Sequence, residues 1–161
     1  MNISNAEKAR RIIEQNVYMA LATSDNSGSP WVATLYYAYD SQYNFYFLSA
    51  KDSLHATHIE INPRVAMAIY DSCAPPGEGD GVQIEGRAYL AKPRELPHII
   101  AVYFRRRFPD EVVRAMHKHF PWEYQGKHLL RFFKVVPVKV YTLDLTETKV
   151  DRRVEVDLFE K

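Results

Sequence analysis

The stretch FYFLSAKDSLHATHIEINPRV, residues 45–65, contains three successive patterns. Residues 45–49 are mostly aromatic and aliphatic, which is typical of a β-strand. Residues 51–61 have helical character, and Asn62-Pro63 ends the helix because a residue before proline disfavours the helical backbone. The apolar run over residues 64–70 predicts another strand. A strand, a helix and a strand are therefore expected in close succession.

Upstream of this stretch, the sequence predicts one helix and two strands. Ser4 can cap a helix over residues 4–16, because Glu7 stands three positions after it. Strands are expected over residues 17–23 and 31–39, since the turn-forming run SDNSGSP separates them. A second turn, DSQYN, leads into the strand that begins at residue 45.

Downstream, a loop over residues 73–81 precedes a fifth strand over 82–90. Two helices over 95–107 and 110–119 follow, and a long last strand over 130–145, bent at Pro137, leads into a charged tail. Short strands joined by hairpin turns, with few helices, predict a mainly-β fold with peripheral helices. We expect a six-stranded antiparallel barrel that forms a single domain of 161 residues.

Composition excludes several classes of function. The net charge of +1 offers no general attraction for nucleic acid or for an anionic membrane. The single cysteine, Cys73, cannot form an internal disulfide and indicates a reducing compartment. No apolar run approaches the roughly 20 residues of a membrane span, and the first residues do not resemble a signal peptide. We expect a cytoplasmic protein that binds neither nucleic acid nor membrane.

Polar groups gather where the third strand gives way to the helix. Ser49, Lys51 and Ser53 lie at this junction, and His55 follows within one turn. A helix start offers free backbone N–H groups, so hydroxyls and a lysine beside it would suit a phosphate. The alternative is an ordinary solvated turn with a helix cap. The many tyrosines and phenylalanines are similarly open to two interpretations, strand propensity or a surface for a planar ligand.

A series of short motifs occurs in a fixed order along the chain. The motifs are Leu21-Ala22-Thr23, Gly28-x-Pro30, Ser53-x-x-Ala56, Asn62-Pro63-Arg64-Val65, Glu85-Gly86 and, near the end, Phe133-Lys134-Val135-Val136-Pro137. In this order they resemble the pyridoxamine-phosphate-oxidase-like flavin-binding split barrels. The resemblance covers residues 17–92 well and 130–145 loosely. It does not cover 93–129, which we interpret as a helical insertion.

The resemblance implies that flavin mononucleotide (FMN) binds at the subunit interface of a homodimer. The implied cofactor-binding residues are Val32, Ala33, Thr34, Leu35 and Tyr37 on the second strand, Leu48, Ser49, Lys51, Ser53, Leu54 and His55 at the phosphate end, and Tyr141 on the last strand, from the second subunit. The implied function is a flavin-dependent oxidoreductase or flavin reductase, with catalytic residues and substrate unknown. Two alternatives are a non-catalytic flavin-binding or sensing protein and a reductase that uses the deazaflavin coenzyme F420.

The chain departs from the pattern of the true oxidases at several positions. Leu54 and His55 stand where those enzymes carry a basic pair, and Val32 and Tyr37 replace an arginine and a lysine. Gly81 stands where a glutamine reaches the flavin. The C-terminal Arg-x-His substrate motif is absent from the sequence. Oxidation of pyridoxine phosphate is therefore not expected.

Other titratable clusters predict no metal site. His55 and His58, three residues apart, are expected at the surface without a third ligand. Tyr103 and Arg107 share one face of a helix, within a basic cluster that we expect to be solvated. His117 and His119 would diverge on a helix, which argues against haem or a metal ion there.

Overall fold

The computed structural model describes residues 3–75, 77–117, 119–144 and 152–160. Its strands are β1 (Tyr18–Ser24), β2 (Pro30–Tyr36), β3 (Ala38–Tyr39), β4 (Phe45–Ala50), β5 (Arg64–Tyr70), β6 (Gly81–Leu90), β7 (Leu130–Leu143) and β8 (Arg153–Glu155). Its α-helices are α1 (Asn5–Gln15), α2 (Leu54–Ile61), α3 (Leu96–Arg107) and α4 (Glu111–Met116). Two short 3-10 helices, Pro93–Glu95 and Pro121–Tyr124, flank the helical segment.

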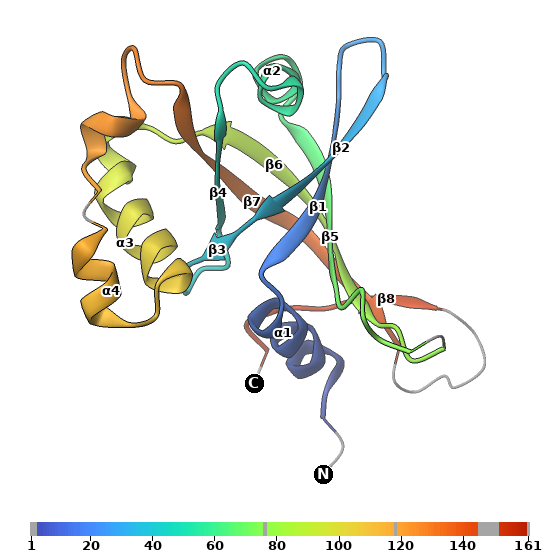
Figure 1. The fold of residues 1–161 in the computed structure, drawn as a ribbon. Helices are drawn as coiled ribbons and strands as arrows, with labels where there is room; N and C mark the ends of the chain where they lie inside the picture. The colour runs from blue at the N-terminus through green and yellow to red at the C-terminus, as the bar shows by residue number, and fades with distance from the viewer. Residues whose placement is uncertain (1–2, 76, 118, 145–151, 161) are drawn as a thin grey trace.

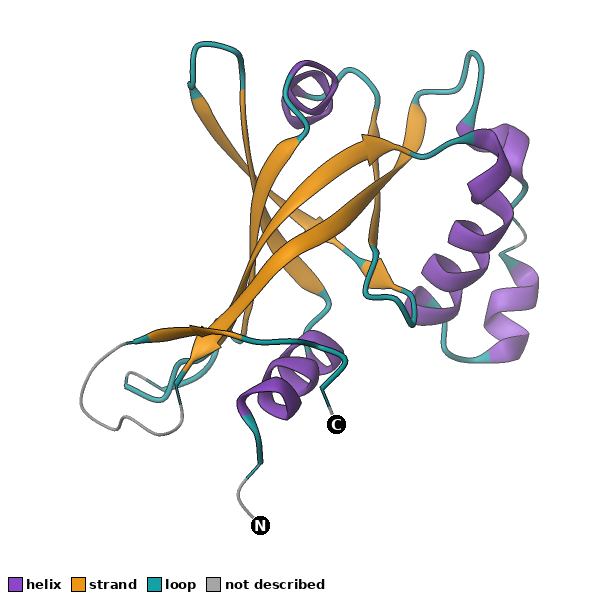
Figure 2. Cartoon of the chain, turned by 180° about the vertical axis from the view of Figure 1, so that it is seen from behind, coloured by secondary structure: helices purple, strands orange, loops and turns teal. Residues whose placement is uncertain are grey.

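All strand pairs are antiparallel, and together they form one curled sheet. The strand order is β2-β1-β5-β6-β7-β4-β3, and β8 pairs with the end of β7. In Figure 1, α1 lies at one end of the curled sheet and α2 at the other, while α3 and α4 pack at the side. Figure 2 shows the long β6 and β7 crossing the middle of the molecule from behind. The predicted mainly-β antiparallel split barrel is confirmed.

Two elements differ from the prediction. The expected second strand is divided at Tyr37, because its first part pairs with β1 and its last two residues pair with β4. The expected charged tail contributes a strand, β8, which pairs with Tyr141 to Leu143 of β7. The six expected strands are thus present, with the second one broken and β8 added. The last residues of the expected final strand lie outside the described residues.

The sheet separates two hydrophobic cores. The inner core fills the curl and includes Phe47, Phe133 and Ile84, with Ile13 of α1 closing one end. The outer core lies between α3 and the outer side of β4 and β7, and it includes Tyr103 and Phe132. The helical segment within residues 93–129 therefore packs against the barrel through this outer core.

Gly86 lies opposite a β-bulge that bends β7. Glu85 pairs with Lys139 but Gly86 pairs with Pro137, so Val138 is the extra residue. A Cβ atom at Gly86 would lie 3.0 Å from the carbonyl oxygen of Val136, which is closer than real Cβ atoms normally approach. The bend that the sequence predicts at Pro137 thus depends on a glycine in the neighbouring strand.

We expect Gly86→Ala to lower the free energy of unfolding by about 1–3 kcal/mol. The added methyl group would press against the β7 backbone, which cannot move without straining the sheet. Urea denaturation followed by circular dichroism measures the change. The control is Gly79→Ala, where an added Cβ meets no atom within 4 Å. Equal effects of the two substitutions would contradict the close approach at Gly86.

Candidate functional site

The junction of β4 and α2 leaves the first turn of the helix open. Ser53 occupies the N-cap position, but its side chain makes no cap hydrogen bond and instead donates to the carbonyl oxygen of Ala50 at 2.8 Å. Within the described residues, the backbone N–H groups of Leu54, His55 and Ala56 have no hydrogen-bond acceptor. Such a helix start is suited to an anion.

The helices α1 and α4, by contrast, are closed by the side chains of their N-cap residues. Ser4 accepts a hydrogen bond from the Glu7 N–H at 3.0 Å at the start of α1. Asp110 accepts one from the Val113 N–H at 2.9 Å at the start of α4. The open turn of α2 therefore reflects where the Ser53 hydroxyl is directed, not the residue type at the cap.

His55 joins two of the predicted serines. Its Nε2 atom lies 2.8 Å from Ser49 Oγ and 3.1 Å from Ser53 Oγ, and its side chain packs near the Phe47 ring. The residue is only 7% exposed. Burial, with a smaller contribution from His58, lowers the pKa of His55 below 6.5, so the imidazole is neutral at pH 7.

The expectation that His55 and His58 lie at the surface is wrong. Both are buried, because α2 lies across one end of the curled sheet and turns this face inward. His58 Nδ1 contacts Thr23 Oγ1 at 3.2 Å, so hydroxyl groups satisfy both imidazoles without a metal ion. Among the described residues, no group of three or more potential ligands could hold a metal.

The charge around the open turn is nearly balanced. Lys51 is exposed, but Asp52 is its exposed neighbour in the same turn. Leu54 is 47% exposed and carries no charge. Any anion held here would therefore depend on N–H groups and hydroxyls more than on net positive charge.

Sequence reasoning missed Arg131 at this corner. Arg131 is the cross-strand partner of Ser49, so the two side chains leave the same face of the sheet. Its guanidinium donates to the carbonyl oxygens of Gly126, His128 and Leu130, which holds it against that loop. Only the pairing of β4 with β7 could have revealed this neighbour, and the sequence did not specify that register.

The remaining predicted residues do not gather at the corner. Tyr37 is fully buried, and its hydroxyl lies 2.6 Å from the Ile13 carbonyl oxygen and 2.8 Å from that of Asn16. The phenol thus belongs to the inner core and does not face the open turn of α2, and its place beside a cofactor stays a prediction. Leu48 packs against the outer core beneath α3, on the opposite face of β4 from Ser49. Leu35 packs against the inner core, and its neighbours Ala33 and Thr34 lie on opposite faces of β2.

Val32 of β2 and Tyr141 of β7 lie on the outer face of the sheet, with three strands between them. They line a hollow of about 360 Å³ whose floor contains four small residues. These are Ala20, Ala22, Ala66 and Ala68. Gln83 also lines the hollow, and its Oε1 atom is buried without a hydrogen-bond partner in the described part of the chain.

Gln83 is a second residue that sequence reasoning missed. Its Nε2 atom lies 3.6 Å from the position that a Cβ on Gly81 would occupy. Residues 81 and 83 share one face of β6 because strand side chains alternate. The side-chain amide of Gln83 thus lies beside Gly81, the position where the resembling oxidases carry a glutamine. The alternation of side chains along a strand could have indicated this from the sequence.

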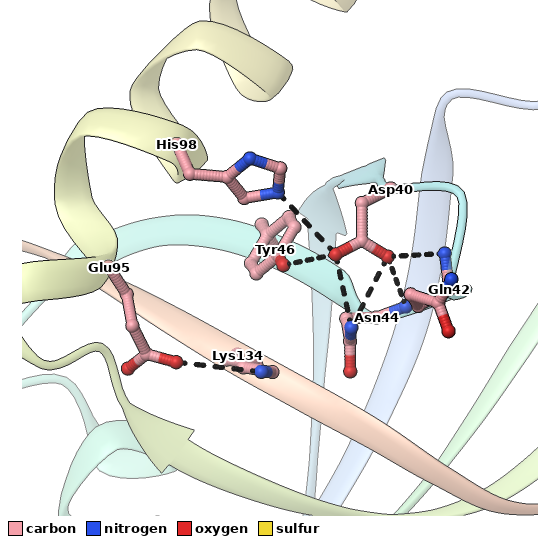
Figure 3. Close-up of polar contacts among 7 residues, drawn as sticks. All are labelled: Asp40, Gln42, Asn44, Tyr46, Glu95, His98 and Lys134. Atoms are coloured by element: carbon pink, nitrogen blue, oxygen red, sulfur yellow. Dashed lines mark hydrogen bonds and ion pairs between the residues drawn. The ribbon is translucent and has the colours of Figure 1, made fainter.

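A carboxylate network fastens the helical segment to the barrel (Figure 3). Asp40 accepts hydrogen bonds from the Tyr46 hydroxyl at 2.6 Å and the Gln42 N–H at 2.9 Å, and His98 of α3 lies 3.5 Å away. Glu95 and Lys134 form a nearby ion pair at 3.5 Å. Donors from the turn before β4 and from Tyr46 occupy the Asp40 carboxylate oxygens, so we regard the network as structural.

We expect Asp40→Asn to reduce the free energy of unfolding by about 1–2 kcal/mol at pH 7, since charge-assisted hydrogen bonds are lost. Burial alone would raise the pKa of Asp40, but hydrogen bonds from Tyr46, Asn44 and Gln42 bring it below 3.8. Because the pKa of Asp40 is lower in the folded than in the unfolded protein, its ionised form stabilises the fold above about pH 4. This contribution is lost as the pH falls through the pKa of the folded state. Urea titrations at pH 7, 5 and 3 should show the two proteins converging at pH 3. A constant difference would contradict the role of the charge.

His117 and His119 do not lie on a helix, because α4 ends at Met116. The argument that they diverge on a helix is therefore wrong. Both line a cavity of about 260 Å³ with Arg105 and Arg114. His119 stacks on the Phe104 ring at 3.8 Å between ring centres, and His117 Nδ1 lies 2.9 Å from the Val113 carbonyl oxygen.

The basic cluster on α3 is only partly solvated. Arg105 and Arg107 are exposed, and Arg107 hydrogen-bonds the buried Tyr103. Arg106 turns inward to carbonyl oxygens at the end of α1. The shared face predicted for Tyr103 and Arg107 is confirmed, but Arg106 is not part of a solvated surface.

Comparisons with known proteins agree with this architecture. Residues 6–144 match the family model described as pyridoxamine 5'-phosphate oxidase. No functionally curated protein matches the chain. No helix in the described ranges is long and apolar enough to span a membrane.

Several solved structures share the fold. A haem-binding protein from Mycobacterium smegmatis superposes with a TM-score of 0.71 and 19% identity, covering 97% of this chain and 59% of that one. The haem storage protein HutZ from Vibrio cholerae gives a TM-score of 0.61 and 18% identity, covering 81% and 87% of the two chains. A Listeria innocua protein assigned to the pyridoxamine 5'-phosphate oxidases gives a TM-score of 0.63 and 18% identity, covering 87% and 98%. At these identities the likeness concerns the fold alone.

Proposed function

Because the chain belongs to the pyridoxamine 5'-phosphate oxidase family, we propose that it binds FMN with the phosphate at the start of α2. The observation that carries this proposal is the open first turn, where three N–H groups lack acceptors beside the hydroxyls of Ser49 and Ser53. The N–H groups are donors and the Ser49 hydroxyl can act as one, as a phosphate requires, whereas the Ser53 hydroxyl already donates to the Ala50 carbonyl oxygen.

The proposed reaction class is that of a flavin-dependent oxidoreductase or flavin reductase. A bound flavin would supply the redox chemistry, and the protein would supply position and polarity. Ser49, Lys51 and the first turn of α2 would hold the phosphate. The exposed side chain of Val32, at 59%, would offer an apolar contact on the edge strand β2. We assign no catalytic acid or base.

A homodimer is part of the same proposal. The hollow floored by the four alanines is largely apolar. Gln83 also lines it, and the Oε1 atom of this residue has no hydrogen-bond partner among the described residues. A second copy on this face would bring Tyr141 and Gln83 of one subunit toward the cofactor of the other. Sedimentation equilibrium tests this, and a monomer at micromolar concentration would contradict it.

The direct test compares FMN with riboflavin, which lacks the phosphate. Quenching of flavin fluorescence should give an affinity at least tenfold higher for FMN, since each charge-assisted contact contributes roughly 1.5–3 kcal/mol. Equal affinities would contradict a phosphate site. Bleaching of the bound flavin by NADH or NADPH would distinguish an oxidoreductase from a passive binder. The deazaflavin coenzyme enters the same titration as the alternative ligand.

Haem is a second candidate, favoured by the cavity beside α4. The contact between His117 Nδ1 and the Val113 carbonyl oxygen places the proton on Nδ1 and leaves Nε2 free as a ligand. Arg105 and Arg114 could pair with carboxylates. Addition of haemin should produce a Soret shift that His117→Ala removes and His128→Ala retains. An unchanged spectrum on mixing would contradict haem binding.

A further inference from the structure

In one arrangement of protons, every polar contact that His55 Nε2 makes at the β4–α2 corner is a hydrogen bond. Ser53 Oγ lies 2.8 Å from the Ala50 carbonyl oxygen, which can only accept, so the Ser53 proton is directed there. Toward His55 Nε2, 3.1 Å away, Ser53 Oγ can then only accept. The contact between His55 Nε2 and Ser53 Oγ is therefore a hydrogen bond only when Nε2 carries a hydrogen.

The same hydrogen determines the role of Ser49. His55 Nε2 is closer to Ser49 Oγ, at 2.8 Å, than to Ser53 Oγ. Ser49 Oγ is thus an acceptor from the imidazole, and its own hydrogen remains for another partner. Among the described residues, the other oxygen that Ser49 Oγ contacts is Ser53 Oγ at 3.4 Å, a weak contact at that distance. The opposite tautomer would set two lone pairs, on Nε2 and on Ser53 Oγ, against each other.

We propose that His55 is a positioning residue which, as its Nε2–H tautomer, holds the Ser49 hydroxyl as a free donor for the cofactor phosphate. This inference rests on the proposed function. It explains how a site can work with Leu54 and His55 where the resembling oxidases carry a basic pair. His55 acts through Ser49 and does not itself need to touch the ligand.

Two substitutions separate this role from packing. His55→Phe keeps a ring beside Phe47 and removes the Nε2 hydrogen, so Ser49 can turn its hydrogen toward Ser53. His55→Gln removes the ring but keeps an Nε2–H donor at a similar reach. We expect His55→Phe to lower the ratio of FMN affinity to riboflavin affinity at least fivefold, and His55→Gln to keep it within twofold of the wild type. Equal ratios in the wild type and His55→Phe, or equal losses in both variants, would overturn the inference.

His58→Phe is the matched control. His58 lies on the same buried face of α2 but contacts Thr23 rather than Ser49. The control should cost stability and leave the ratio of the two affinities unchanged. A ratio that falls as much as in His55→Phe would show that any buried histidine of α2 has this effect, which would overturn a specific role for His55.

A measurement on the cofactor-free protein separates this inference from the proposed function. Long-range ¹H–¹⁵N correlation spectra distinguish the two neutral tautomers of histidine, and His55 should be protonated at Nε2. Protonation at Nδ1 would overturn the inference even if FMN binds tightly. If the wild type fails to distinguish FMN from riboflavin, the proposed phosphate site fails, whatever the tautomer.

Discussion

Replacement of Arg106 by methionine is expected to lower the free energy of unfolding by about 3–5 kcal/mol, the largest stability effect that we predict. The Arg106 guanidinium lies 3.0 Å from the carbonyl oxygen of Ile13 and 3.2 Å from that of Glu14, at the C-terminal end of α1. It also lies 4.9 Å from the centre of the Tyr37 ring. The last carbonyl groups of a helix have no N–H donor within the helix. A cation that donates hydrogen bonds to them satisfies these groups and also interacts favourably with the helix dipole.

The cost is large because α1 supplies no cation of its own. Its last turn contains no basic residue, so the charge comes from α3, about ninety positions later in the chain. Methionine can fill the space but donates to none of the three carbonyl oxygens, and the single hydrogen of the Tyr37 hydroxyl can serve only one of them. The free energy of unfolding of Arg106→Lys should lie between those of the wild type and Arg106→Met. An ammonium group keeps the positive charge but not the planar, forked set of donors.

The neighbouring Arg105 provides the control for this experiment. It lies on the same helix with an exposed side chain, so Arg105→Met should change the free energy of unfolding by no more than about 0.5 kcal/mol. Guanidinium denaturation measures both variants. Hydrogen exchange at the amides of α1 should also become faster in Arg106→Met alone. A difference of less than 1 kcal/mol between the two variants would contradict the role assigned to Arg106.

Local signals predicted the elements of this fold well. Ser4 and Glu7 indicated the start of α1, and Asn62-Pro63 indicated the end of α2, because caps and proline effects act within a few residues. The break at Tyr37 was missed, since it arises where the strand changes partner from β1 to β4. The strand β8 was missed because it is short and two of its three residues are charged, so the local pattern did not predict its pairing with the end of β7.

The candidate site was predicted in part for the same physical reason. Ser49, Ser53 and His55 are near in sequence, so a strand followed directly by a helix brings them together. The burial of Tyr37 was not predicted, because it depends on α1 and α3, which the local pattern does not specify. Arg131 was missed because its position opposite Ser49 depends on the register between β4 and β7.

The double substitution Ser49→Ala and Lys51→Met is expected to weaken FMN binding between tenfold and a thousandfold. It removes the hydroxyl whose hydrogen is free and the exposed cation of the corner. Asp52 then remains in the turn without the adjacent charge of Lys51, so its repulsion of the phosphate adds to the lost contacts. Two charge-assisted hydrogen bonds of roughly 1.5–3 kcal/mol each set this range.

Riboflavin provides the internal reference for this variant, because it presents the same ring without a phosphate. Its affinity should stay within about twofold of the wild-type value, whereas FMN affinity falls. The substitution Lys92→Met, at an exposed lysine before α3, controls for general loss of positive charge. FMN binding by the wild type should also weaken as salt rises, since Lys51 is solvent-exposed and its attraction is screened. Parallel losses for FMN and riboflavin would mean that the variant disturbs the ring pocket or the fold, and that the phosphate lies elsewhere.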